Sequence, residues 1–205
     1  MLELKSLACT RGSRQLFAGL NLSVIAGQLL RVTGVNGAGK TSLLRTVCGL
    51  MMPSAGQVLW QGADVQKLRD EFNRQLIYVG HAAALKDDLS ALENLCAAAT
   101  LGGNTVAISA AQAALIESGL KGRERMPSRN LSQGQKRRVA LARLALGASA
   151  ALWVLDEPFN ALDSAATDWL LGLITGHLQR GGLVVLTSHQ PVALPASVQQ
   201  RVLAL

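Results

Sequence analysis

The sequence is poor in aromatic residues and has no long uninterrupted apolar run. Phe, Trp and Tyr together make up 3% of its 205 residues. Its longest uncharged stretches, residues 94–116 and 181–200, are interrupted by polar residues or proline, whereas a membrane-spanning helix needs about 20 consecutive apolar residues. The first residues also lack the basic and apolar segments of a secretory signal. We therefore expect a chain that stays in the cytoplasm unless a partner carries it to a membrane.

Cysteine and histidine are scarce as well, with three residues of each. Cys9, Cys48 and Cys96 are widely spaced and form no CxxC pair, which argues against a disulfide framework and against a structural zinc site. We therefore expect reduced thiols. The absence of CxxCH also excludes covalent haem attachment by that motif.

Positive charge is in excess, with a formal net charge of +7, and it is unevenly distributed. Between residues 121 and 143 the only acidic residue is Glu124. An anionic partner fits there, and polyphosphate, acidic lipid headgroups and nucleic acid are the candidates. Nucleic acid is disfavoured because almost no aromatic residues accompany the basic cluster to stack on bases. The basic cluster consists of Lys121, Arg123, Arg125, Arg129, Lys136, Arg137, Arg138 and Arg143.

Apolar residues make up 49% of the chain, and turn residues divide it into alternating strands and helices. This alternation predicts one α/β domain over residues 1–205, with a mostly parallel sheet and flanking helices. We expect an antiparallel β subdomain at the N-terminal side of this domain, and an Ala- and Leu-rich helical subdomain of about residues 83–130 inserted within it. We expect strands over 2–8, 20–25, 29–33, 57–60, 76–79, 151–155 and 183–187, and helices over 42–50, 132–147 and 164–179.

The spacing Gly34-x-x-x-x-Gly39-Lys40-Thr41 is typical of a phosphate-binding loop. Its glycines let backbone N–H groups surround a polyphosphate, Lys40 neutralises the outer phosphates, and the Thr41 hydroxyl can bind Mg²⁺. The alternative is an ordinary glycine turn, but a chance match in a chain of this length is expected about once in a hundred. We therefore expect the nucleotide contacts to come from Gly34, Val35, Asn36, Gly37, Ala38, Gly39, Lys40, Thr41 and Ser42.

An apolar strand ending at Leu155 is followed by two adjacent carboxylates, Asp156 and Glu157. Side chains at the carboxyl end of such a strand can reach the Mg²⁺ of a nucleotide held by a phosphate loop. We expect Asp156 to hold the metal through water, and Glu157 to act as general base toward the water that attacks the γ-phosphate. The alternative, a solvated acidic cap before a helix, is weakened by the phosphate loop in the same chain.

Three further segments resemble motifs of ATP-binding cassette (ABC) proteins. The LSGGQ signature corresponds to Leu131-Ser132-Gln133-Gly134-Gln135, the D-loop to Asn160-Ala161-Leu162-Asp163, and the switch histidine to His189. The resemblance implies a P-loop NTPase core of ABC type that hydrolyses ATP, with Lys40, Glu157 and His189 as catalytic residues. It also implies a head-to-tail homodimer whose nucleotide is contacted by Ser132, Gln133, Gly134 and Asp163.

Two positions depart from the ABC pattern. Arg11 stands where the family has an aromatic residue that stacks on adenine, and His81 stands in place of the Q-loop glutamine. The Arg11 guanidinium can stack on the base through cation–π attraction, and a solvated turn residue is the alternative. His81 is a candidate metal ligand because it takes the place of that glutamine.

The chain is similar from end to end to the ATP-binding subunits of cytochrome c maturation haem-export systems, in which the histidine at position 81 is usual. This likeness rests on residues 9–20, 78–81, 85–95, 137–143, 155–159 and 188–191. It implies integral-membrane cytochrome c maturation subunits as partners, haem reached only through those partners, and no nucleic acid. It also implies a peripheral location at the cytoplasmic face of the bacterial inner membrane.

Three alternatives stay open. A soluble ABC ATPase acting on nucleic acid or ribosomes would suit the basic charge, but such proteins usually contain tandem cassettes or a long coiled coil, and neither fits in 205 residues. An exporter of another lipid or small molecule would keep the same chemistry. A purely structural nucleotide-binding module is disfavoured because Lys40, Asp156, Glu157 and His189 are all present.

Overall fold

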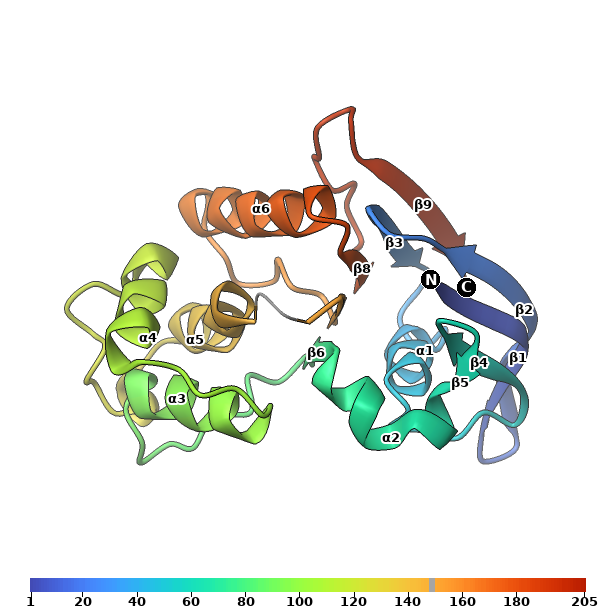
Figure 1. Ribbon diagram of the computed structural model, residues 1–205, viewed down its shortest axis with the longest axis horizontal. Helices are drawn as coiled ribbons and strands as arrows, with labels where there is room; N and C mark the ends of the chain where they lie inside the picture. Colours follow the sequence, from blue (N-terminus) through green and yellow to red (C-terminus); the bar gives the residue numbers. More distant parts are fainter. Residues whose placement is uncertain (148–149) are drawn as a thin grey trace.

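The computed structural model describes residues 1–147 and 150–205, and it contains two β-sheets with helices around them (Figure 1). The strands are β1 (Leu2–Arg11), β2 (Arg14–Val24), β3 (Gln28–Thr33), β4 (Ala55–Trp60), β5 (Ala63–Asp64), β6 (Leu76–Val79), β7 (Leu152–Leu155), β8 (Leu183–Thr187) and β9 (Gln199–Ala204). The helices are α1 (Lys40–Val47), α2 (Val65–Arg74), α3 (Ala91–Leu101), α4 (Ile108–Leu115), α5 (Gln133–Leu146) and α6 (Ser164–Gln179), with a short π-helix, η1 (Ile116–Leu120), and a short 3-10 helix, η2 (Ser128–Asn130). The expected α/β class is confirmed.

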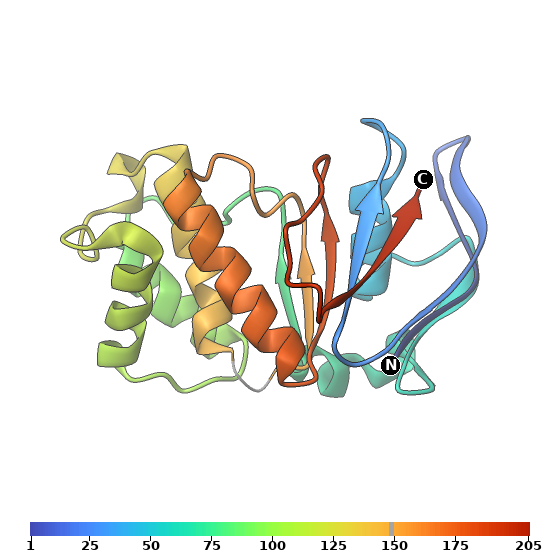
Figure 2. The same ribbon diagram turned by 90° about the horizontal axis from the view of Figure 1, so that it is seen from above.

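Five strands form a parallel sheet in the order β6-β7-β8-β3-β9. Alternate residues of β7 face two cores: Leu152 and Val154 join the cluster that contains α1, whereas Trp153 and Leu155 join the cluster that contains α6. Both faces are therefore buried, which explains why the strand reads as an unbroken apolar run. From above, α5 and α6 lie on one side of this sheet and α1 on the other (Figure 2). Because the strands are parallel, the loops that leave the carboxyl ends of β3, β7 and β8 meet at one edge.

A smaller antiparallel sheet has the order β2-β1-β4-β5 and lies beyond α1 (Figure 2). Its apolar residues share a core with α1 and with the near face of the parallel sheet. Arg11 and Arg14 pair at the end of the β1–β2 hairpin. This end of the hairpin lies near the phosphate loop, because Arg11 and the loop line one cavity.

The helices α3, α4 and α5 share a third apolar cluster, separate from the two that cover the sheet. Ser90 and Glu93 form a capping box at the start of α3, which satisfies N–H groups that a helix leaves unpaired. Helix α5 contributes Val139 to the third cluster and Leu141 to the α6 cluster, so it connects the helical part to the sheet. Across the described ranges, no helix combines the length and the apolar character needed to cross a membrane.

Most expected elements are present, and β6, β8 and α6 have the expected bounds. Strands β1 and β2 are longer than expected because they pair up to the hairpin turn. Helix α1 begins at Lys40 and ends before Gly49, whose φ is 71°. Helix α2 and strand β9 were not expected from the sequence. In α2 only Val65 and Phe72 are buried, and β9 is an edge strand without clear alternation, so neither gives a strong periodic signal.

Candidate active site

The phosphate loop connects the end of β3 to the first turn of α1. Gly39 precedes the helix with φ of 105°, in the left-handed region that favours glycine. Lys40 is 7% exposed, and its Nζ donates to the carbonyl of Gly34 at 2.8 Å and to that of Val35 at 3.2 Å. The loop therefore curls around its own lysine. The first N–H groups of α1 have no partners within the helix and can face an anion.

A cavity of about 260 Å³ opens over this loop. Arg11, from the β1–β2 hairpin, and Glu157, after β7, both contribute to its wall. One cavity is therefore lined by Arg11, which differs from the ABC pattern, by the phosphate loop, and by Glu157, the expected general base. The lining residues are Arg11, Leu16, Asn36, Gly37, Gly39, Lys40, Thr41, Ser42 and Glu157.

Asp156 is buried at the end of β7, and both of its carboxylate oxygens accept hydrogen bonds. Thr41 Oγ1 donates to Oδ2 at 2.8 Å, and Thr187 Oγ1 donates to Oδ1 at 2.8 Å. Thr41 lies in the first turn of α1, which follows β3 through the phosphate loop, and Thr187 ends β8. The carboxylate after β7 therefore joins segments that follow or end three neighbouring strands. Mg²⁺ prefers oxygen ligands and is commonly bound through a carboxylate together with substrate phosphates. The Thr41 and Asp156 oxygens therefore fit the expected metal.

Glu157 has an uncommon backbone conformation, with φ of 48°, which a non-glycine residue keeps only where its surroundings hold it there. Its N–H donates to Thr187 Oγ1 at 2.7 Å. Its side chain is 18% exposed, and one carboxylate oxygen lies 3.2 Å from His189 Nε2. Asn160 Nδ2 donates to the other oxygen. A partly open carboxylate beside the phosphate-loop cavity can accept a proton from water.

His81 lies on the other side of the same carboxylate, with Nδ1 at 3.9 Å from Glu157 Oε2. Its side chain is 71% exposed. An imidazole suits zinc, copper or nickel better than Mg²⁺, and in the described ranges no three His, Cys, Asp or Glu side chains are grouped to hold a metal ion. At 3.9 Å the two side chains are near each other but not hydrogen-bonded, and metal binding by His81 stays a prediction.

The signature segment begins α5 and lies outside the phosphate-loop cavity of its own chain. Ser132 caps the helix: its hydroxyl accepts from the Gln135 N–H at 3.3 Å, and its N–H donates to the Gln135 side chain at 2.9 Å. A Cβ on Gly134 would lie 2.5 Å from the Ala161 carbonyl oxygen, so only glycine fits there. Gln133 lines a second cavity, of about 410 Å³, which also includes Glu157.

Asp163 uses both of its oxygens within its own chain. Oδ1 accepts from the Ala166 N–H at 2.9 Å and caps α6, and Oδ2 lies 2.5 Å from Arg138 Nη2. The nucleotide contact expected of Asp163 is therefore not made inside one chain, and it stays a prediction for the dimer.

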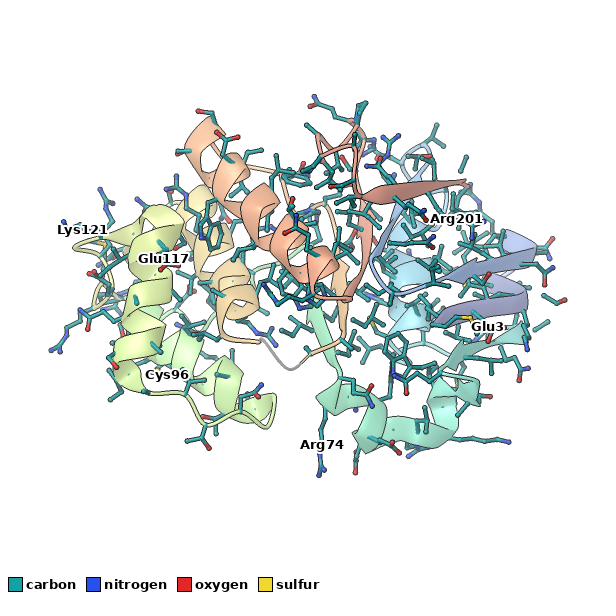
Figure 3. The ribbon with its side chains drawn as sticks, turned by 45° about the horizontal axis from the view of Figure 1, so that its top comes forward. Glu3, Arg74, Cys96, Glu117, Lys121 and Arg201 are labelled. Atoms are coloured by element: carbon teal, nitrogen blue, oxygen red, sulfur yellow. The ribbon has the colours of Figure 1, made fainter. Side chains whose placement is uncertain are left out.

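The basic cluster is spread over the structure, and part of it is paired or buried, so an anionic partner at this segment stays a prediction. Lys121 lies at the far end of the helical part (Figure 3), whereas Arg137 is 5% exposed and lies beneath the site. Folding also brings acidic residues from other segments to the cluster, which the sequence alone does not reveal. Three ion pairs result, at 2.6, 3.0 and 2.5 Å: Arg129 with Asp88, Lys136 with Asp87, and Arg138 with Asp163.

Two residues of the site, Thr187 and Arg137, were not expected there from the sequence. Thr187 is fully buried and links Asp156 to the backbone of Glu157. The sequence feature that could have indicated it is a polar residue at the end of an apolar strand. Arg137 donates to main-chain carbonyls at the ends of β6 and β7. Burial lowers the pKa of its guanidinium, and the nearby carboxylates of Asp156 and Glu157 raise that pKa. Nothing in the sequence separates this arginine from its basic neighbours.

The sequence pattern of the ABC transporter family matches residues 17–160 of the chain. The chain is 53% identical over 196 residues to the cytochrome c biogenesis ATP-binding export protein CcmA of Dechloromonas aromatica (strain RCB), with 96% of each chain covered. It is 50% identical to the CcmA protein of Pseudomonas aeruginosa, over 96% of this chain and 97% of that one. It is 45% identical to the CcmA protein of Escherichia coli O157:H7, over 98% of this chain and 95% of that one.

Solved structures agree with the sequence relatives. The ATP-binding subunit of an ABC transporter superimposes with a TM-score of 0.82 at 26% identity, over 92% of this chain and 79% of that one. The dimeric structure of MJ0796, a bacterial ABC transporter cassette, superimposes with a TM-score of 0.81 at 26% identity, over 93% of this chain and 88% of that one. The chain therefore belongs to the ABC transporter family and is an ABC-type ATPase.

Proposed function

We propose that this chain is the ATP-hydrolysing subunit of an ABC system for cytochrome c biogenesis, and that it powers haem export or the release of a haem-loaded chaperone. The near full-length identity with proteins named cytochrome c biogenesis ATP-binding export proteins supports the pathway. The hydrolytic part rests on one observation: the Glu157 carboxylate lies beside His189 and lines the phosphate-loop cavity.

ATP enters the cavity over the phosphate loop as substrate. The Lys40 ammonium exchanges its contacts with the loop carbonyls for contacts with the β- and γ-phosphates, and the Arg11 guanidinium stacks on the base. These contacts hold the γ-phosphate near Glu157. Lys40 therefore contributes to both binding and charge neutralisation in the transition state.

Hydrolysis then needs a water molecule between Glu157 and the γ-phosphorus. The water oxygen attacks the phosphorus, the bond to the β,γ-bridging oxygen breaks, and ADP leaves with that electron pair. The proton of the water passes to the Glu157 carboxylate, which acts as general base. His189, 3.2 Å from the same carboxylate, contacts the γ-phosphate and helps to position the attacking water.

Thr41 and Asp156 are the residues that would hold Mg²⁺. When bound, the metal neutralises charge on the β- and γ-phosphates. The protein's own contribution is to keep the Asp156 carboxylate fixed, because Thr187 Oγ1 holds its second oxygen at 2.8 Å.

The active form is a head-to-tail homodimer. Ser132, Gln133 and Gly134 lie outside the cavity of their own phosphate loop, so we infer that they, with Asp163, contact ATP held by a second copy. The dimeric structure of a cassette at 26% identity supports this arrangement. Closure of the two chains on two ATP molecules would be the mechanical output.

Integral-membrane subunits of the cytochrome c maturation system are the proposed partners, at the cytoplasmic face of the bacterial inner membrane. The region from His81 into the helical part is the proposed docking site.

Haem is reached only through those partners: His81 and His189 face the catalytic carboxylate, and His177 is buried and stacked on Trp153. Nucleic acid is not a partner, because much of the basic cluster is paired or buried.

The test is to express tagged Glu157→Gln protein at native level and to solubilise the membranes with ATP present. Mass spectrometry and an absorption spectrum of the purified complex identify what co-purifies. We expect integral-membrane cytochrome c maturation subunits and a haem Soret band, and we expect both to be lost in the Lys40→Ala variant, which lacks the phosphate contact. A membrane subunit of another exporter, or ribosomal proteins, would contradict the proposed pathway and leave the ATPase chemistry standing.

A further inference from the structure

Arg137 is a buried cation that pairs with no carboxylate among the residues that the structure describes. It lies on α5 and is 5% exposed, and in the part of the chain that the structure describes it forms no ion pair. A buried charge is costly unless hydrogen bonds satisfy it. The hydrogen bonds of this guanidinium therefore show which groups stabilise the buried charge.

Those contacts are four main-chain carbonyls from two strand ends. Nη1 donates to Gly80 O at 2.6 Å and to His81 O at 3.4 Å, just after β6. Nη2 donates to Asp156 O at 2.7 Å and to Glu157 O at 3.1 Å, just after β7. The planar, forked guanidinium can join two such groups in a fixed geometry, which the single ammonium of lysine cannot.

The backbone that Arg137 holds is the backbone that carries the catalytic carboxylate. Glu157 has φ of 48°, and its peptide groups are fixed on two sides: the N–H donates to Thr187 Oγ1, and the carbonyl accepts from Arg137. On the other strand end, the same guanidinium fixes the peptide of His81, whose imidazole lies beside Glu157.

We propose that Arg137 is a positioning residue for ATP hydrolysis, which fixes the backbone of Glu157 and His81 so that both side chains keep their places relative to the γ-phosphate. This role rests on the proposed function. Arg137 should therefore affect the rate of hydrolysis and not the affinity for the nucleotide, because none of its four hydrogen bonds is to the phosphate loop.

The test compares Arg137→Met, which keeps the apolar stem but no donor, with Arg137→Lys, which keeps the charge and part of the hydrogen bonding. Arg143→Met is the matched control, since Arg143 is a half-buried arginine on the same helix with no side-chain hydrogen bond recorded among the described residues. For each purified full-length variant we would measure kcat, KM for ATP, the Kd of a non-hydrolysable ATP analogue and the thermal midpoint.

We expect kcat of Arg137→Met to fall at least tenfold while KM and Kd change less than threefold, with an intermediate kcat for Arg137→Lys. Arg143→Met should keep kcat within twofold of the parental value. The proposal is overturned if folded Arg137→Met keeps kcat within twofold, or if its KM and Kd rise as much as kcat falls. If Arg137→Met does not fold, the same criteria apply to Arg137→Lys, with a threefold fall in kcat expected.

Amide hydrogen exchange gives a second readout that does not depend on activity. Peptides covering residues 77–83 and 153–160 should exchange faster in the Arg137 variants than in Arg143→Met, and equal exchange would overturn the proposal. A parental protein that hydrolyses no ATP would contradict the proposed function instead, and the exchange result would then decide on Arg137 alone.

Discussion

Thr187→Val tests whether the buried threonine at the end of β8 organises the catalytic carboxylates. The Thr187 hydroxyl donates to Asp156 Oδ1 at 2.8 Å and accepts from the Glu157 N–H at 2.7 Å. The residue is 0% exposed. Valine has nearly the same shape as threonine but no hydroxyl. Because its methyl group fills the same buried space, no water can enter to replace the two lost hydrogen bonds.

The expected loss of stability follows from these two bonds. A hydrogen bond to a charged group contributes about 1.5–3 kcal/mol, and a buried N–H left without an acceptor costs about 1–3 kcal/mol. We therefore expect Thr187→Val to lower the free energy of unfolding by about 3 kcal/mol. For a chain of this length, that corresponds to a fall of about 6–12 °C in Tm. ATP hydrolysis should slow as well, because Asp156 and Glu157 lose a shared support.

Thr46→Val is the matched control. Thr46 is equally buried, but its hydroxyl donates to the Ser42 carbonyl one turn back in α1, at 2.9 Å. Losing this bond should cost only about 1 kcal/mol. Urea titrations of the two variants measure the difference, and steady-state ATPase assays measure its functional consequence. Equal losses of stability, or an unchanged kcat in Thr187→Val, would refute the role given to Thr187.

Two further predictions concern packing and pH. Burial lowers the pKa of His177 to about 4, so the unfolded chain binds a proton more tightly than the folded one. The free energy of unfolding should therefore fall with decreasing pH between about 6.5 and 4, by up to about 1.4 kcal/mol per pH unit. Urea titrations at pH 5 and pH 7 should show a smaller difference in His177→Phe; an equal difference would contradict the assignment. Gly134→Ala should lose about 1–3 kcal/mol because its methyl group meets the Ala161 carbonyl. Gly172→Ala, in open space on α6, should gain up to about 1 kcal/mol, and thermal unfolding compares the two.

The phosphate loop and the acidic pair are predictable from sequence because each is a local pattern. A glycine loop needs fixed spacing between its strand and its helix, and Asp156 and Glu157 follow directly on an unbroken apolar strand. The central strands are predictable for a related reason, since burial of both faces removes polar residues from them.

The remaining features depend on contacts between distant segments. Nothing local distinguishes Arg137, which is buried, from Arg138 beside it, which pairs with Asp163. The acidic partners of the basic cluster are hidden from the sequence for the same reason, because Asp87 lies 49 positions before its partner Lys136. Strand β9 is defined by its pairing with β3 and not by its own composition.

Steady-state hydrolysis by purified Glu157→Gln tests most directly whether Glu157 is the general base. Nucleotide binding should be measured in the same samples, with parental protein and Lys40→Ala as references. We predict that Glu157→Gln binds ATP within threefold of the parental affinity but hydrolyses it at least about a hundredfold more slowly, as expected when a general base is removed. Hydrolysis by Glu157→Gln at the parental rate, with Lys40→Ala inactive, would contradict the account.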